Sequence, residues 1–179
     1  GNMPNHDATA GQIGATWGLA YQRSTKKLFA SALQKRHSGF ASLGTGGIYQ
    51  IDYSSGSAVV SNWLDVNTLV GVSTGSDPHT GLGANNARSY DPASFDAVGK
   101  ISIGDIDISD DEQYLYAVNL NNKEILKIRI SDKMLVSRTT IPDPGCTNSS
   151  NKILKLINFG ISTSATAHFS GFESGNTYV

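Results

Sequence analysis

The segment from residue 71 to residue 100 concentrates side chains that can do chemistry. A histidine among carboxylates can act as a general base or a metal ligand, as in a hydrolase. Asparagine, aspartate and tyrosine side chains can instead bind a sugar or a Ca²⁺ ion. The third interpretation is a loop that folds on itself through turns at its two Asp-Pro pairs, and we favour it. The candidate binding residues are Asp77, His79, Asn85, Asn86, Arg88 and Asp91, with Tyr90 beside them.

A second candidate site is the acidic pair formed by Asp105 and Asp107. These residues alternate with Ile106 and Ile108, which puts both carboxylates on one face of an extended strand. Such a pair can help to hold Ca²⁺, which takes several oxygen ligands, and calcium is the one cofactor that the sequence suggests. The stretch "DIDISDDEQYLY" has neither the glycine nor the final glutamate of an EF-hand. Hydrogen bonding to the backbone of a neighbouring blade is the alternative, and the one that we favour.

The loop from residue 33 to residue 47 places cations next to an aromatic ring, with Lys35, Arg36 and His37 close to Phe40. This combination can bind an acidic glycan or peptide. Alternatively, Phe40 packs under its own loop, which is the interpretation that we favour. The four histidines of the chain do not show the spacing of a zinc site.

The candidate residues lie in or between two copies of one sequence pattern. The stretch 17–32 aligns without a gap with 104–119, which pairs Leu19 with Ile106 and Leu28 with Leu115. The alignment resumes later with a shift of ten residues, which "RHSGFASLGT" absorbs as a loop. Alternating apolar and polar residues between turn signals predict four short antiparallel strands per copy. The predicted strands span 17–22, 27–33, 47–53 and 58–66 in the first copy, and 104–109, 114–120, 124–130 and 134–141 in the second.

Two details of the second copy follow from the alignment. Asp110 and Asp111 stand where the first copy has "RSTK", so we interpret them as turn residues rather than as part of a site. Ile103 and Ile106 belong to runs of opposite alternation, which predicts a β-bulge near Gly104.

A repeated four-stranded unit of about 45 residues is typical of a β-propeller blade. We therefore predict an all-β protein with two blades, about 15–66 and 101–142, in a domain of residues 1–148. The blades are joined by a long loop, 67–100, and the tail, 149–179, has no clear pattern and could form a partial blade. Propellers use about four to eight blades, so other blades of the same protein or of neighbouring chains must cover the open faces. The predicted core is Trp17, Leu19, Leu28, Phe29, Tyr49, Ile51, Ile106, Ile108, Leu115, Tyr116, Leu126 and Ile128.

The stretch "GDIDISDDEQYLYAVNLNNKEILKI" resembles the YVTN-type propeller blade of microbial surface proteins. Together, "WGLAYQRSTKKLFASALQKRHSGF", "LGTGGIYQID", "DPHTG", "FDAVGKISIGDIDIS" and "IPDPGCTN" resemble the propeller region of large secreted bacterial proteins that carry adhesin-type immunoglobulin-like repeats. The resemblance covers about residues 12–148. It implies an extracellular or cell-surface bacterial protein, and it implies no reaction.

Composition narrows the partners. The chain has 14 Lys and Arg against 15 Asp and Glu, a formal charge of −1, which argues against nucleic acid and anionic membranes. It has no run of 18 apolar residues, so we expect no membrane insertion. The single cysteine, Cys146, is expected to pair outside this chain, with a buried free thiol as the alternative.

These observations predict a non-enzymatic extracellular module for scaffolding, adhesion or assembly. Its expected partners are other blades and, at the loops, a glycan or a surface protein. Two alternatives remain open. One is a calcium-dependent propeller hydrolase of lactonase-like type, and the other is a structural subunit of a filament or sheath.

Overall fold

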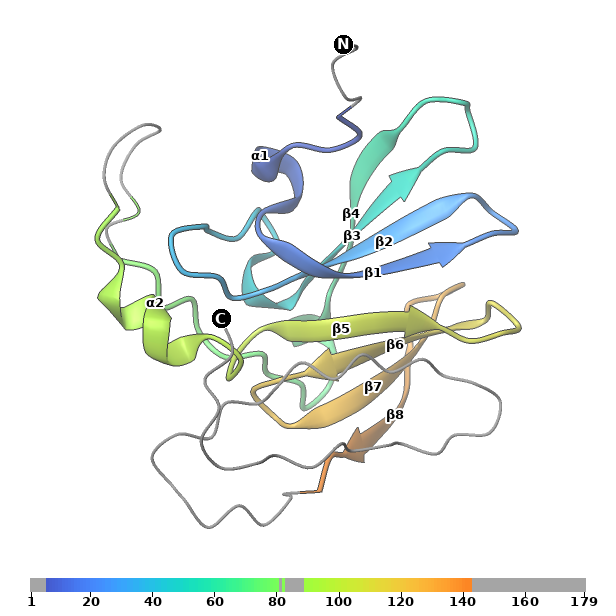
Figure 1. Ribbon diagram of the computed structural model, residues 1–179. Coiled ribbons are helices and arrows are strands. Elements are labelled where there is room, and N and C mark those ends of the chain that lie inside the picture. Colours follow the sequence, from blue (N-terminus) through green and yellow to red (C-terminus); the bar gives the residue numbers. More distant parts are fainter. Residues whose placement is uncertain (1–5, 81, 83–88, 143–179) are drawn as a thin grey trace, which may run out of the picture.

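The computed structural model describes residues 6–80, 82 and 89–142, and these residues form two four-stranded antiparallel sheets (Figure 1). In each sheet the strands follow one another in chain order. The predicted strand boundaries agree with the observed ones to within one residue. Sheet 1 contains β1 (Thr16–Gln22), β2 (Lys27–Ala32), β3 (Gly47–Asp52) and β4 (Val59–Asp65), and sheet 2 contains β5 (Ile103–Ile108), β6 (Tyr114–Asn119), β7 (Glu124–Arg129) and β8 (Leu135–Thr140).

The two sheets share one strand register. Leu19 pairs with Ala30 in sheet 1, and Ile106 pairs with Ala117 in sheet 2, as the sequence alignment requires. Both first strands also have a register irregularity before these residues, which confirms the bulge predicted near Gly104. The residues that the sequence alignment matches therefore lie at corresponding positions of β1 and β5.

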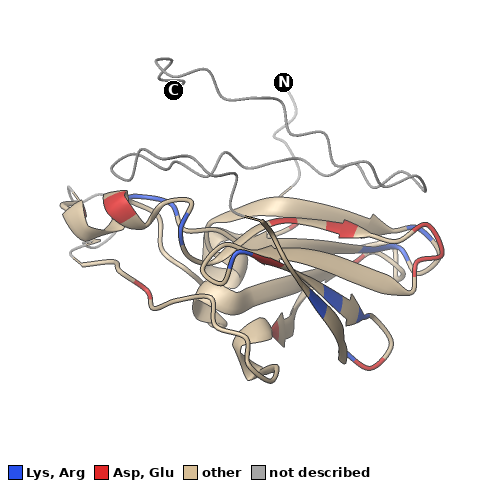
Figure 2. Cartoon of the chain, turned by 90° about the horizontal axis from the view of Figure 1, so that it is seen from below, with Lys and Arg blue, Asp and Glu red and all other residues tan. Residues whose placement is uncertain are grey.

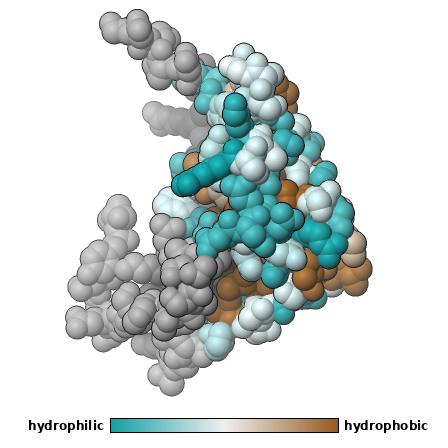
Figure 3. Space-filling model, turned by 90° about the vertical axis from the view of Figure 1, so that its right-hand side faces the viewer, coloured by the Kyte–Doolittle hydropathy of each residue, from teal (hydrophilic) through white to brown (hydrophobic). Residues whose placement is uncertain are grey.

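The acidic stretch between β5 and β6 is a hairpin turn. Asp111 accepts hydrogen bonds from the Gln113 amide, at 3.1 Å, and from the Ser109 hydroxyl, at 2.5 Å. The predicted turn role of Asp111 is thereby confirmed, and Asp110 is an exposed residue of the same turn. Most charged side chains lie at such turns and at strand ends, with both signs interspersed (Figure 2). The side of the molecule that carries the hairpin ends alternates hydrophilic and apolar areas (Figure 3).

Sheet 2 packs on sheet 1 with β1 beside β5 (Figure 1). Gly18 allows this approach, because a Cβ at this position would lie 2.6 Å from the Ile106 nitrogen. Ser31 links the sheets by donating its hydroxyl to the Gly104 carbonyl at 3.1 Å. The core between the sheets consists of Ala20, Phe29, Ile48, Trp63, Val66, Val72, Ile103, Ile106, Leu115, Ala117, Leu126 and Ile128.

The predicted core is wrong for Trp17 and Leu19, which are 57% and 58% exposed. The reason is the alternation of β1: Gly18 and Ala20 face sheet 2, so their neighbours face the opposite side. Three further members of the predicted core, Leu28, Ile108 and Tyr116, are half-buried. The members that are buried as predicted are Phe29, Tyr49, Ile51, Ile106, Leu115, Leu126 and Ile128.

The segment between the sheets contains a helix that the sequence interpretation missed. Helix α2 (Pro92–Ala97) begins after Asp91, so the Asp-Pro pair starts a helix rather than a turn. The other short elements are α1 (Ala10–Ile13), η1 (Gly44–Gly46) and η2 (Val66–Thr68). No helix among the described residues is long and apolar enough to cross a membrane.

Ser102 joins the two sheets to the segment between them. This buried residue has a positive φ of 69°, and its amide donates to the Thr74 carbonyl at 2.7 Å. Its hydroxyl lies 2.8 Å from the carbonyl oxygens of Ala32 and Thr45, and its own carbonyl accepts from the Leu120 amide at 3.1 Å. One residue thus holds four separate parts of the backbone.

Candidate functional site

The first candidate site is the outer face of sheet 1, which we define as the β1 side chains Trp17, Leu19 and Tyr21. They are 57%, 58% and 48% exposed, although each is a large apolar or aromatic side chain. The counterpart of Leu19 in sheet 2 is Ile106, which is 4% exposed because it packs on sheet 1. Leu19 therefore occupies a position that sheet 2 buries against a neighbouring sheet.

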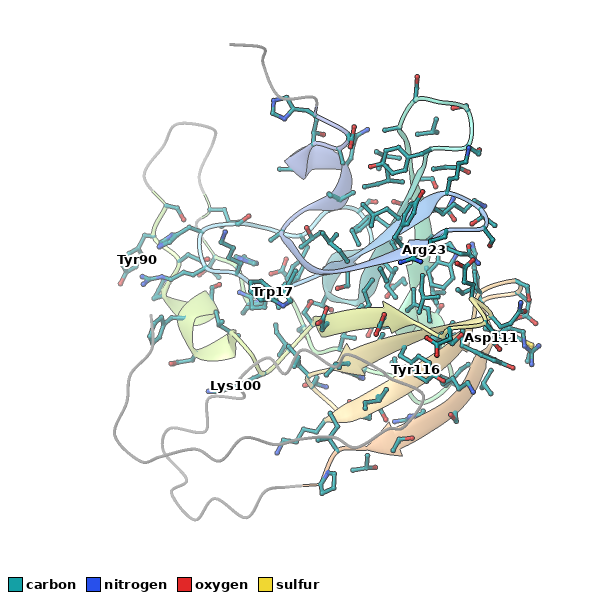
Figure 4. The ribbon with its side chains drawn as sticks, turned by 45° about the vertical axis from the view of Figure 1, so that its right-hand side comes forward. Trp17, Arg23, Tyr90, Lys100, Asp111 and Tyr116 are labelled. Carbon is teal, nitrogen blue, oxygen red and sulfur yellow. The ribbon has the colours of Figure 1, made fainter. Side chains whose placement is uncertain are left out.

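Beside these side chains, the residues of β2 and β3 that pair in line with Leu19, namely Ala30 and Tyr49, are covered within the described chain. Tyr49 is fully buried, and its hydroxyl accepts a hydrogen bond from the Leu43 amide at 3.2 Å. Tyr53 donates its hydroxyl to Asp7 of the N-terminal segment at 3.0 Å. In Figure 4, Trp17 lies toward one end of β1, and Arg23 lies just beyond the other end. The open part is thus a strip along the length of β1.

The second candidate site is a cluster in which two loops meet around His79. The Nδ1 atom of His79 lies 2.6 Å from an oxygen of Asp77, and its Nε2 atom lies 3.1 Å from the Lys35 carbonyl oxygen. A second carboxylate, that of Asp91, lies 3.6 Å from Nε2. The His79 side chain is 3% exposed and that of Asp91 is fully buried. The structure therefore unites residues of the 33–47 loop with residues of the 71–100 segment.

Asp91 organises the backbone around this cluster. Its two carboxylate oxygens accept hydrogen bonds from the amides of His37, at 3.1 Å, and Thr80, at 3.4 Å. Its carbonyl oxygen accepts from Arg36 Nε at 3.2 Å. A buried carboxylate needs such donors, because an unpaired one is costly.

Gln34 and Ser94 complete the cluster. The Gln34 side-chain nitrogen donates to the Ser94 hydroxyl and lies 3.5 Å from His79 Nε2. The Gln34 oxygen is buried and has no hydrogen-bond partner in the described part of the chain. The Gln34 side-chain oxygen is therefore available to accept a hydrogen bond.

The environment favours the charged forms of His79 and Asp91. Burial lowers the pKa of His79, but the Lys35 carbonyl and the carboxylates of Asp77 and Asp91 outweigh it, so the pKa is raised from 6.5. Burial raises the pKa of Asp91, but hydrogen bonds from His37, Thr80 and Ser94 and the charge of His79 outweigh it, so the pKa falls below 3.8. Both shifts favour a charged pair, with the His79 ring between the carboxylates of Asp77 and Asp91.

Aromatic rings surround the cluster. Phe40 is half-buried and meets the His79 ring edge-on, with the centroids 5.5 Å apart, so it packs against the 71–100 segment. Arg36 lies over the Phe95 ring, 5.7 Å from its centroid, rather than over Phe40. Phe95 and Tyr90, which flank Asp91 in the chain, are 66% and 76% exposed, and Figure 4 shows Tyr90 at the edge of the molecule.

Asp105 and Asp107 lie on β5, and one oxygen of each accepts a hydrogen bond from the amide of the following residue. Burial and the nearby charge of Asp107 raise the pKa of Asp105 above 3.8, against the lowering effect of the Ile106 amide. Within residues 6–80, 82 and 89–142, no group of three or more His, Cys, Asp or Glu is placed to hold a metal ion.

The structure brings Asp77, His79 and Asp91 together. The other predicted loop residues, Asn85, Asn86 and Arg88, lie outside the described residues, as do Cys146 and the tail 149–179. Sequence reasoning missed Gln34 and Ser94. The Asp-Pro helix start was a usable signal for Ser94, whereas no local pattern marks Gln34.

Comparisons with known proteins give distant similarities. No protein-family model matches the chain. Over 137 residues the chain is 34% identical to Colossin-D of Dictyostelium discoideum, and the match covers 73% of this chain but only 14% of Colossin-D. A solved structure of a luciferin-regenerating enzyme has a TM-score of 0.44 and 16% sequence identity, and the match covers 74% of this chain and 32% of that one.

Proposed function

We propose that this chain is a non-enzymatic module of β-propeller type from an extracellular or cell-surface protein, and that it serves assembly or adhesion. The observation that carries the proposal is the contrast between Leu19 and Ile106. These residues hold the same place in the repeat, yet one is 58% exposed and the other 4%. The outer face of sheet 1 is therefore the place where a further sheet would dock, in the way that sheet 2 docks on sheet 1.

The energetic argument supports docking at this face. Full burial of a leucine or an aromatic side chain contributes about 1.5–3 kcal/mol. Trp17, Leu19 and Tyr21 are each about half exposed. Covering two of these side chains therefore contributes about as much as the full burial of one, about 1.5–3 kcal/mol. A strip of this kind on a soluble protein usually marks an interaction surface.

The extracellular and adhesive part of the proposal comes from the blade-like sequence pattern. It is supported by the resemblance to secreted surface proteins that carry adhesin-type repeats. The chain spans 14% of the length of Colossin-D, so a longer protein of this kind has room for further sheets. The partner that we propose for the outer face is a sheet of the same type, here supplied by a second copy of the chain.

Light scattering over a concentration series tests this proposal. We expect the wild-type chain to associate as its concentration rises, and Leu19→Asp to remain monomeric because it puts a charge in the centre of the strip. The matched control is Val70→Asp, which changes a side chain that is 90% exposed and belongs to the segment after η2, and which should associate like the wild type. A wild-type chain that stays monomeric at all concentrations would contradict the proposal.

A further inference from the structure

We propose that His79 is a protonation-controlled latch that joins residues 34–40 to residues 77–80 and 91–94. In its doubly protonated form it fastens these segments together, and loss of one proton loosens them. This inference is independent of the proposed function, because it concerns the loop cluster and not the outer face of sheet 1.

The two contacts of His79 to oxygen atoms are satisfied together only when both ring nitrogens carry a proton. Nδ1 lies 2.6 Å from a carboxylate oxygen of Asp77, and Nε2 lies 3.1 Å from the Lys35 carbonyl oxygen. Both oxygens are acceptors, so each nitrogen must donate. A neutral imidazole has one donor and would set a lone pair against one of these oxygens. The imidazolium therefore satisfies both contacts at once, whereas the neutral ring satisfies only one of them.

The charges around the ring are consistent with this state. Asp77 and Asp91 supply two carboxylates, and the other nearby charged side chains point elsewhere or bind the backbone. Arg36 donates to the Asp91 carbonyl oxygen, and the exposed His37 ring lies 3.0 Å from the Ser89 hydroxyl. The side chain of Lys35 is exposed, and only its carbonyl meets His79. The positive ring is thus the direct counter-charge of both acids.

A second hydrogen-bond arrangement is within reach when His79 is neutral. The Gln34 side-chain nitrogen lies 3.5 Å from Nε2 and at present donates to the Ser94 hydroxyl. A neutral Nε2 can accept from this amide instead of donating to the Lys35 carbonyl. The Gln34 oxygen has no partner in the described part of the chain, so no hydrogen bond of this oxygen opposes a rotation of the side-chain amide. Two alternative partners for one ring nitrogen are what a two-state switch needs.

The latch holds a part of the surface that carries exposed aromatic rings. The Asp91 carboxylate joins the His37 and Thr80 amides, so residues 34–40, 77–80 and 91–94 share one charged centre. The core is fastened separately, through the Thr45 and Thr74 hydroxyls, which lie 2.8 Å apart. Opening the latch therefore changes how Tyr90 and Phe95 are presented and leaves the two sheets in place.

The direction of the pH dependence follows from the sign of the shift. The folded protein raises the pKa of His79 above 6.5, so the latch is fully closed below 6.5 and opens as the pH rises through the folded value. The pKa of Asp91 lies below 3.8, so protonation of this acid loosens the cluster only in stronger acid. The latch is therefore closed at pH values between the folded pKa of Asp91 and the folded pKa of His79.

Nuclear magnetic resonance on the full chain tests the latch. The ring signals of His79 should titrate above 6.5, and the exchange protection of the His37 and Thr80 amides, corrected for intrinsic rates, should fall across the same titration. Each pH unit by which the pKa exceeds 6.5 corresponds to a tenfold change in protection. Protection of the β6 and β7 amides should stay constant.

Variants make the test specific. Asp77→Asn keeps the hydrogen-bonding shape of the side chain but removes its charge, so the midpoint for both amides should move to lower pH. His6→Gln changes an exposed histidine of the N-terminal segment and should leave the midpoint unchanged. A His79 that titrates below 6.5, or His37 and Thr80 amides whose protection ignores its titration, would overturn the latch.

Discussion

Gly18 lies so close to Ile106 that a side chain at position 18 has no room, since its Cβ would come within 2.6 Å of the Ile106 nitrogen. This contact sets the distance between sheet 1 and sheet 2. The same Cβ would also lie 2.7 Å from the Ser31 hydroxyl, which bridges to β5. The glycine is therefore required by the neighbouring sheet and not by its own strand.

Replacing Gly18 by alanine should destabilise the fold by about 1–3 kcal/mol, because the two first strands must move apart. Urea unfolding measures this loss. The matched control is Gly11→Ala in α1, where a Cβ would meet nothing closer than 3.9 Å, and the free energy of unfolding should barely change. Equal stability of Gly18→Ala and wild type would mean that the sheets do not pack as described.

Phe29 of β2 and Tyr116 of β6 are matched by the sequence alignment but should differ in their contribution to stability. Phe29 is fully buried and meets Trp63 edge-on, with the centroids 4.9 Å apart, whereas Tyr116 is half-buried. Phe29→Ala should cost about 3–5 kcal/mol and Tyr116→Ala about 1–2 kcal/mol in the free energy of unfolding. Costs of similar size for the two variants would be evidence that a further sheet covers Tyr116 as sheet 2 covers Phe29.

Glu112 should make the contact between the two hairpin ends sensitive to acid. Its carboxylate accepts hydrogen bonds from the amides of Ser24 and Arg23, both at 3.0 Å, and the bonds from Ser24 above all lower the pKa of Glu112 below 4.5. This stabilisation is complete above pH 4.5 and is lost as the pH falls through the lower folded value. The melting temperature of Glu112→Gln should therefore depend less on pH between 5 and 3 than that of the wild type. An unchanged acid profile would show that the carboxylate contributes nothing at this contact.

The acidic pair on β5 should respond to charge removal rather than to chelation. The pKa of Asp105 is raised by burial and by Asp107, so ionisation at neutral pH opposes folding, and Asp105→Asn should raise the melting temperature at pH 7. A chelator should leave the wild-type melt unchanged. Stabilisation of the wild type by added Ca²⁺, absent in Asp105→Asn, would instead establish calcium binding at this pair.

Strand boundaries and register could be predicted because they follow from local patterns. Alternation with period two, and the sequence alignment that matches Leu19 with Ile106, placed all eight strands. The exposure of Leu19 could not be predicted, since alternation shows that a side chain faces one side and not what lies there. The propeller itself stays a prediction, because two sheets do not form a ring.

The cluster around His79 could be predicted only in part, because its residues come from segments far apart in the chain. Asp77, His79 and Asp91 were recognisable as chemically capable residues, but their meeting with Lys35 and Gln34 depends on contacts between segments about 45 residues apart. No periodicity encodes such contacts. The helix after Asp91 could have been predicted, because Pro at the first helical position after an Asp is a known start signal.

Ser102 has a consequence for the order of folding. Its hydroxyl meets the carbonyls of Ala32 and Thr45, which are 70 and 57 residues away in the chain. Contacts of such long sequence separation form late, because the intervening chain must first lose its freedom. The hairpins of each sheet can close on their own within microseconds. We therefore expect the two sheets to form early and their docking around Ser102 to limit the folding rate.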